Sequence, residues 1–204
     1  MKALFVTDRR AVGQERLDRV LESLREAPSL SVQIREPGAT DREVLTQTRR
    51  ARELLGPAVP LYVHRRFDLA LRAGAGGVHL PAAGLPVGRV RANTPHGFRI
   101  GVSTHSAAEA AAAMEEGADL IVLGPIFDTP SKRAMGRPLG PAELEKLPPN
   151  RPASCELYAI GGIDAETLPE LLPVRSRFDG VAAIRFFQDA ADPRAALSRI
   201  QEAG

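Results

Sequence analysis

The sequence predicts a single-domain α/β protein over residues 1–204, folded as a compact, closed (β/α)8 barrel, the TIM-barrel architecture. Short apolar runs alternate with amphipathic stretches eight times, the pattern of parallel strands joined by helices. The clearest runs are apolar at every position, as in strands that a layer of helices covers. No linker rich in Pro, Gly or Ser divides the chain. An open doubly wound sheet is the alternative, because strand number alone does not decide closure.

The predicted strands are β-branched apolar runs of about four to seven residues, within the usual length of strands. Residues 120–123 (LIVL) and 181–184 (VAAI) carry no polar side chain at all. In chain order the strands are predicted at residues 3–7, 30–35, 59–64, 76–80, 99–103, 119–124, 156–161 and 179–184.

The helices between them are predicted from apolar spacing at three and four residues and from start signals. Thr40 with Glu43, and Ser106 with Glu109, are capping-box pairs, while Asp164 and Asp192 stand at N-cap positions. The predicted helices are residues 12–27, 40–55, 67–73, 106–116, 164–172 and 192–203. Residues 125–141 form the least regular stretch, and long loops of this kind are often functional.

Composition excludes several function classes. The formal net charge is +2, the aromatic fraction is 4% and there is no Trp, so nucleic acid is not an expected partner. No run of 18 apolar residues exists, and the first residues read as a strand rather than a secretion signal, so no membrane association is expected. The single Cys155 excludes an internal disulfide and favours a reducing compartment. We therefore expect a cytoplasmic protein.

In a barrel the functional side chains lie at the carboxyl ends of the strands. Three of the four histidines fall at such ends in this sequence, and His96 lies in a turn. The candidates at the ends of the second to fifth strands are Gln33, Arg35, His64, His79, Ser103 and His105. Arg35 is suited to bind a substrate carboxylate, and the alternative role is an ion pair with Glu36 or another acid.

A phosphate site is predicted at the ends of the last two strands. Gly161 and Gly162 allow backbone N–H groups to approach an anion, and Arg185 can bind phosphate with two hydrogen bonds. A tight turn from strand to helix is an equally good explanation of the two glycines alone.

Several motifs, taken together, resemble the thiamine phosphate synthase superfamily in order and spacing over nearly the whole chain. They are residues 32–36 (VQIRE), 66–71 (RFDLAL), 77–80 (GVHL), 101–106 (GVSTHS), 117–119 (GAD), 124–132 (GPIFDTPSK) and 159–163 (AIGGI). The resemblance implies a closed barrel that binds a thiazole phosphate. The superfamily contains the synthases and the related TenI-like thiazole tautomerases.

The part of the site that binds the thiazole phosphate is retained. By the resemblance, Thr129, Ser131 and Lys132 contact the substrate and its phosphate, and Gly162 is the contact after the seventh strand. Ile184 and Arg185 stand where the family binds the phosphate through backbone groups and a serine, and the arginine in place of that serine can either hold the phosphate or block it.

The metal site of the synthases is not retained. Their second-strand lysine is Pro37 here, and the aspartates that the resemblance implies for magnesium are replaced by Arg65 and Gly84. An arginine cannot ligate Mg²⁺. We therefore expect no metal and no cofactor, and we expect synthase activity to be unlikely.

The favoured hypothesis is then a TenI-like isomerase that aromatises a carboxythiazole ethyl phosphate by proton transfer. The tautomerase histidine after the sixth strand is Pro125 here, so His105 is the first candidate base, His64 the second and His79 the third. The alternatives are a thiamine phosphate synthase and a non-catalytic barrel that binds thiazole phosphate. The expected partner is a small thiazole phosphate, and the resemblance suggests a homodimer.

Overall fold

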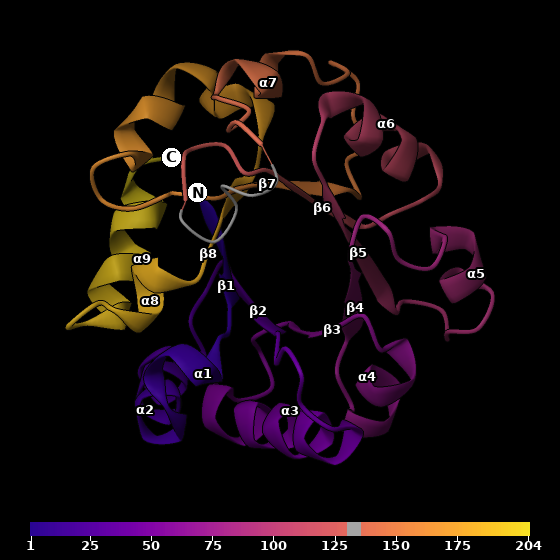
Figure 1. Ribbon diagram of the computed structural model, residues 1–204, viewed down its shortest axis with the longest axis vertical. Helices are drawn as coiled ribbons and strands as arrows, with labels where there is room; N and C mark the ends of the chain where they lie inside the picture. Colours follow the sequence, from indigo (N-terminus) through magenta and orange to yellow (C-terminus); the bar gives the residue numbers. More distant parts are fainter. Residues whose placement is uncertain (130–135) are drawn as a thin grey trace.

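The computed structural model describes residues 1–129 and 136–204. Within them, parallel strands β1 to β8 follow one another in chain order and close into a barrel (Figure 1). β1 pairs with β2 on one side and with β8 on the other, which confirms the predicted closure and excludes an open sheet. The strands are β1 Lys2–Val6, β2 Leu30–Ile34, β3 Leu61–His64, β4 Gly77–Leu80, β5 Arg99–Thr104, β6 Leu120–Leu123, β7 Glu156–Ile160 and β8 Gly180–Ala183.

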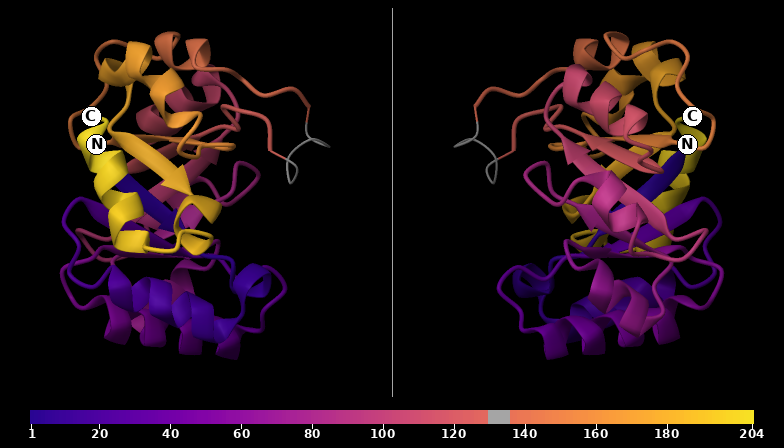
Figure 2. Two further views of the ribbon diagram at one scale, coloured as in Figure 1. Left: turned by 90° about the vertical axis from the view of Figure 1, so that its left-hand side faces the viewer. Right: turned by 90° about the vertical axis from the view of Figure 1, so that its right-hand side faces the viewer.

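The helices form a layer outside the strands, and both termini lie together on one side of the molecule (Figures 1 and 2). The amino group of Met1 donates a hydrogen bond of 2.9 Å to the carbonyl oxygen of Gln201. In the described residues the helices are α1 Arg9–Val12, α2 Gln14–Ser23, α3 Asp41–Leu55, α4 Phe67–Ala73, α5 Val87–Arg91, α6 Ala107–Glu115, α7 Ala142–Glu145, the 3₁₀ helix η2 Leu168–Arg177, α8 Arg185–Gln188 and α9 Pro193–Glu202.

Three predicted helix starts are confirmed by side-chain caps. Thr40 and Glu43 form the full capping box of α3. The Ser106 hydroxyl accepts from the backbone N–H of Glu109 at the start of α6, and the Asp192 carboxylate accepts from two backbone N–H groups at the start of α9. Each cap satisfies donors that the first turn of a helix leaves without partners.

Two predicted helices differ from the structure. The helix predicted at residues 12–27 is the shorter α2, and Gly13, with a positive φ of 79°, separates it from α1, which was not predicted. The α-helix predicted from residue 164 is instead the 3₁₀ helix η2, which contains Pro169 and Pro173. Proline has no N–H and disrupts the hydrogen bonds of an α-helix. Asp164 caps the turn before η2 through the N–H groups of Glu166 and Thr167.

Successive side chains along each strand point alternately outward and inward, which gives the protein two hydrophobic cores. Outward residues such as Phe5, Val32 and Ile121 pack under the helices, whereas Leu4 and Leu120 fill the interior of the barrel. Near the amino ends of the strands, the interior is filled by Tyr62 and Tyr158, which are both 1% exposed. Glu156 also lies there and forms ion pairs with Lys2 at 2.6 Å and with Arg99 at 3.3 Å. A filled interior leaves only the carboxyl end of the strands open to a ligand.

In the described part of the chain, no helix combines the length and the apolar character that crossing a membrane requires.

Candidate active site

The polar residues predicted on β2 to β5 lie together at the carboxyl half of the barrel interior. The strand register sets His64 beside His79 and His79 beside Gly101. The side-chain nitrogen of Gln33 lies 3.1 Å from Nδ1 of His64. We assign the Gln33 amide nitrogen as the donor, so that Nδ1 of His64 accepts this hydrogen bond. The structure thus brings together Gln33, His64 and His79, which sequence reasoning named separately.

His79 is a buried neutral residue that contacts the Ser103 hydroxyl. Its side chain is 2% exposed, its Nε2 lies 2.9 Å from the Ser103 hydroxyl, and its Nδ1 has no partner in the described residues. Burial lowers the pKa of His79 to about 3, and His64 nearby adds a smaller part. We assign the proton to Nε2, because the unpartnered Nδ1 then keeps a lone pair rather than a stranded N–H. Ser103 therefore accepts from His79 and can donate its own proton to a ligand.

The absence of a side chain at residue 101 makes room for this histidine. A Cβ added to Gly101 would lie 2.6 Å from Nδ1 of His79 and 3.1 Å from the Leu120 side chain. Both distances are shorter than ordinary van der Waals contact, so a larger residue has to displace the imidazole.

We expect Gly101→Ala to lower the free energy of unfolding by about 1–3 kcal/mol, the usual range for overpacking a core. Urea unfolding measures the change. Gly88→Ala on α5 is the matched control, because a Cβ at Gly88 meets nothing within 4 Å and alanine favours a helix. Equal stability of Gly101→Ala and the wild type would contradict this packing.

His105 forms a hydrogen bond to the end of β6. Its Nδ1 lies 2.6 Å from the carbonyl oxygen of Gly124, so this nitrogen carries the proton and donates. Its backbone N–H donates to the Glu109 carboxylate at 2.8 Å. The side chain is therefore oriented by the two neighbouring loops, and it connects the ends of β5 and β6.

Arg35 is not paired with Glu36, which was the alternative role considered from the sequence. Glu36 accepts instead from Arg9 at 3.2 Å and from the Thr7 hydroxyl at 3.3 Å. Thr7 in turn accepts from the backbone N–H of Arg35 at 3.0 Å. Sequence reasoning missed Thr7 and Arg9, because no local pattern predicts a contact between residues that are about 27 positions apart.

The loops after β6 and β7 are held against each other. The N–H of Ile126 donates to the carbonyl of Ile160 at 2.8 Å, and that of Phe127 donates to the carbonyl of Gly161 at 3.0 Å. Gly162 has a φ of 64°, and a Cβ there would lie 2.5 Å from the carbonyl oxygen of Asp128. Thr129, on the same loop, is 9% exposed. Ser131 and Lys132, the other predicted contacts, lie outside the described residues.

The predicted phosphate residues fall on neighbouring strand ends. β7 and β8 pair through Ile160 and Ala182, so Gly161 and Gly162 lie beside Ile184 and Arg185. Arg185 is exposed at the start of α8 and contributes a minor part to the lowered pKa of Asp164, which comes mainly from its hydrogen bond to the backbone of Thr167. The structure therefore places these four residues at one side of the barrel mouth.

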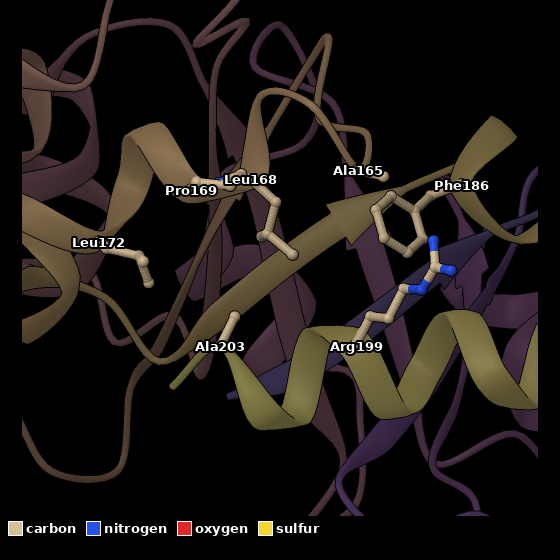
Figure 3. A pocket seen from close by; sticks show the side chains of 7 residues that line it. All are labelled: Ala165, Leu168, Pro169, Leu172, Phe186, Arg199 and Ala203. Carbon is tan, nitrogen blue, oxygen red and sulfur yellow. The ribbon is translucent and has the colours of Figure 1, made fainter.

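A separate groove of about 330 Å³ lies outside the barrel, between η2 and α9. Figure 3 shows Leu168, Leu172 and Phe186 lining it, with the Arg199 side chain extended along one edge. Its lining is mainly apolar and includes none of the predicted site residues. We therefore place the candidate site at the barrel mouth and not in this groove.

The family of the chain follows from comparison with known proteins. Residues 3–187 match the family model described as thiamine monophosphate synthase. The chain belongs to the thiamine monophosphate synthase family. A putative thiamine-phosphate synthase of Geobacter sulfurreducens is 37% identical over 191 residues, which are 93% of this chain and 88% of the relative. A thiamine-phosphate synthase of Methanoculleus marisnigri is 36% identical over 201 residues, 98% of this chain and 93% of the relative.

A solved structure of the same family supports the fold. Thiamine phosphate pyrophosphorylase from Pyrococcus furiosus superposes with a TM-score of 0.78 at 28% sequence identity, covering 99% of this chain and 94% of that one. Because the match covers nearly the whole chain, it includes all eight strands of the barrel.

These findings correct the predicted reaction. The hypothesis of a TenI-like isomerase is wrong, and so is the expectation that synthase activity is unlikely, because relatives matched over most of the chain are named thiamine-phosphate synthases. The assignment of His105 and His64 as bases depended on the isomerase reaction and is withdrawn with it. The superfamily itself was predicted correctly.

The residues of this thiamine monophosphate synthase family member do not fit the magnesium ion that the resemblance implies. Arg65 and Gly84 stand where carboxylates are implied, and Mg²⁺ requires oxygen ligands. In residues 1–129 and 136–204, no group of three or more His, Cys, Asp or Glu side chains is placed to hold a metal ion. We derive no step through a metal.

Proposed function

We propose that the protein is a thiamine-phosphate synthase, which joins a thiazole phosphate to a hydroxymethylpyrimidine pyrophosphate at the mouth of the barrel. The observation that carries this proposal is the similarity over 98% of the chain to a relative named thiamine-phosphate synthase. The described residues of the predicted thiazole phosphate site support it, because Thr129, Gly162 and Arg185 follow the neighbouring strands β6, β7 and β8.

The reaction forms one bond and breaks one. The thiazole nitrogen forms a C–N bond to the methylene carbon of the pyrimidine, and the C–O bond to pyrophosphate breaks with its electron pair. The product is a thiazolium with a fixed positive charge, and pyrophosphate leaves as an anion. No proton has to be removed in this reaction, so the synthase does not need a histidine base at the position of Pro125.

The two sides of the mouth suit two heteroaromatic rings. On the side of β2 to β5, Gln33 and Ser103 present hydrogen-bonding groups that can bind ring nitrogens and an exocyclic amine. On the other side, Val122, Ile160 and Ile184 present apolar surface from β6, β7 and β8. We propose that Gln33, Ser103 and His79, acting through Ser103, orient the pyrimidine ring.

The phosphate of the thiazole is assigned to the opposite rim. Gly161, Gly162 and Ile184 offer backbone N–H groups, and Arg185 offers a guanidinium for the phosphate oxygens. Thr129, Ser131 and Lys132 complete this set in our proposal. The role of these residues is to hold the thiazole nitrogen in line with the pyrimidine carbon, which is how positioning accelerates a substitution.

Incubation of the protein with both precursors tests the proposal. We expect thiamine phosphate to be formed, identified by chromatography and mass, only when both precursors are present. The assay is run with Mg²⁺ and again with EDTA, so that the outcome does not depend on how the pyrophosphate is bound. No product under either condition would contradict the synthase. A homodimer and a cytoplasmic location stay predictions of the sequence.

A further inference from the structure

Two arginines at the barrel mouth, Arg35 and Arg65, form no ion pair with an acidic side chain among residues 1–129 and 136–204. Arg35 follows β2, and its neighbour Glu36 is occupied by Arg9 at 3.2 Å. Arg65 follows β3, is exposed, and has no ion pair in the described residues. The adjacent Arg66 differs, because it is paired with Asp41 at 2.6 Å and with Asp68 at 2.7 Å. The structure thus separates a neutralised arginine from two unpaired ones.

The backbone sets the two unpaired arginines on neighbouring strand ends. Ile34 pairs with Val63 in the parallel register, so Arg35 comes level with His64 and next to Arg65. The N–H of Arg65 donates to the carbonyl of His79 at 2.9 Å, which fixes this residue at the rim above β4. Arg65 has a φ of 67°, a conformation that is uncommon for a residue with a side chain. Strained backbone of this kind occurs often at functional sites.

Position 65 is also where the family resemblance implies a magnesium-binding aspartate. A guanidinium cannot bind Mg²⁺, but it stays charged at any working pH and binds phosphate oxygens with two parallel hydrogen bonds. The substitution therefore removes a metal ligand and supplies a positive charge at the same place. Two such charges can balance the negative charge that collects on a departing pyrophosphate.

We propose that Arg35 and Arg65 bind the pyrophosphate group directly, in place of a metal ion, so that this site takes a pyrophosphate without Mg²⁺. This inference rests on the proposed function for the identity of the anion. Since both side chains are partly or fully exposed, the binding has to weaken as salt screens their charge.

Calorimetric titration with inorganic pyrophosphate tests the inference without any reaction. We expect the wild type to bind in EDTA as tightly as in Mg²⁺, and more weakly at high salt. Arg65→Gln and Arg35→Gln are each expected to weaken binding about tenfold or more, the usual effect of removing one charge-assisted partner. Arg89→Gln, which removes an exposed charge from α5 on the outside of the barrel, is the control and is expected to change binding less than twofold.

Two results would overturn the inference: pyrophosphate binding that requires Mg²⁺, or unchanged binding by Arg65→Gln. Far-ultraviolet circular dichroism checks that each variant is folded, which is expected because Arg65 contributes an exposed side chain. The proposed function fails separately, if pyrophosphate binds in EDTA as expected but the two precursors give no thiamine phosphate. Product formation together with strictly Mg²⁺-dependent pyrophosphate binding would retain the synthase and reject the arginine site.

Discussion

Gly162→Ala is expected to lower kcat/KM for thiamine phosphate formation about 100-fold, the cost of displacing a positioned group by about 1 Å. An added Cβ would lie 2.5 Å from the carbonyl oxygen of Asp128 and 2.8 Å from Cβ of Phe127. These atoms belong to the loop after β6, which also carries Thr129. The substitution therefore forces that loop away from the turn after β7, and the two sides of the thiazole phosphate site separate.

Gly74→Ala is the matched control for this effect. Gly74 has a φ of 71°, close to the 64° of Gly162, but a Cβ at Gly74 meets nothing within 4 Å. Both variants carry the same backbone strain, of about 1 kcal/mol, and only one displaces a site loop. Steady-state kinetics of both variants decide the matter. Equal kcat/KM for Gly162→Ala and Gly74→Ala would show that the contact between the two loops does not position the substrate.

Acidification from pH 7 to pH 4.5 is expected to cost the protein about 2–3 kcal/mol of stability through His79 alone. The pKa of this residue falls from 6.5 to about 3 on folding, chiefly because burial disfavours the charged ring. The unfolded chain therefore binds a proton in this range that the folded chain does not. The stabilisation is present above pH 6.5 and is lost as the pH falls toward 3.

Urea unfolding across this pH range measures the loss, and His79→Gln provides the comparison. The glutamine nitrogen can take the place of Nε2 and keep a hydrogen bond to Ser103, but it does not titrate. The lowered pKa values of Asp18, Asp68 and Asp164 also make stability fall in acid, and these carboxylates are the same in both proteins. We expect the difference in stability between wild type and variant to shift by 2–3 kcal/mol as the pH falls. A constant difference would mean that His79 is protonated in the folded state.

The strands could be predicted because the apolar pattern that defines each of them lies within one short segment of the sequence. A run such as residues 120–123 is apolar on both faces because helices cover its outer face and side chains fill the barrel on its inner face. All eight predicted strands are present. The helix caps were equally local, since Thr40 and Glu43 are neighbours on one turn. The two helices that differ from the prediction contain or adjoin residues with special backbone preferences, which are Gly13 between α1 and α2 and the prolines Pro169 and Pro173 in η2.

The site was predicted only in part, because contacts between distant residues leave no local signal. Gln33 and His64 were named from their strand ends, but their hydrogen bond depends on the register of β2 and β3. The pairing of Glu36 with Arg9 was not foreseen, although it decides whether Arg35 carries a free charge. The reaction was predicted wrongly, because the loss of the implied metal carboxylates was taken as the loss of the synthase reaction itself.

The most direct test of the central claim is the stoichiometry of a single turnover with enzyme in excess over the two precursors. Thiamine phosphate and pyrophosphate are quantified in the same quenched samples. The account predicts that both appear at the same rate and in equal amounts, because one C–N bond forms for each C–O bond broken. Release of pyrophosphate without thiamine phosphate, or consumption of the thiazole phosphate alone, would contradict it.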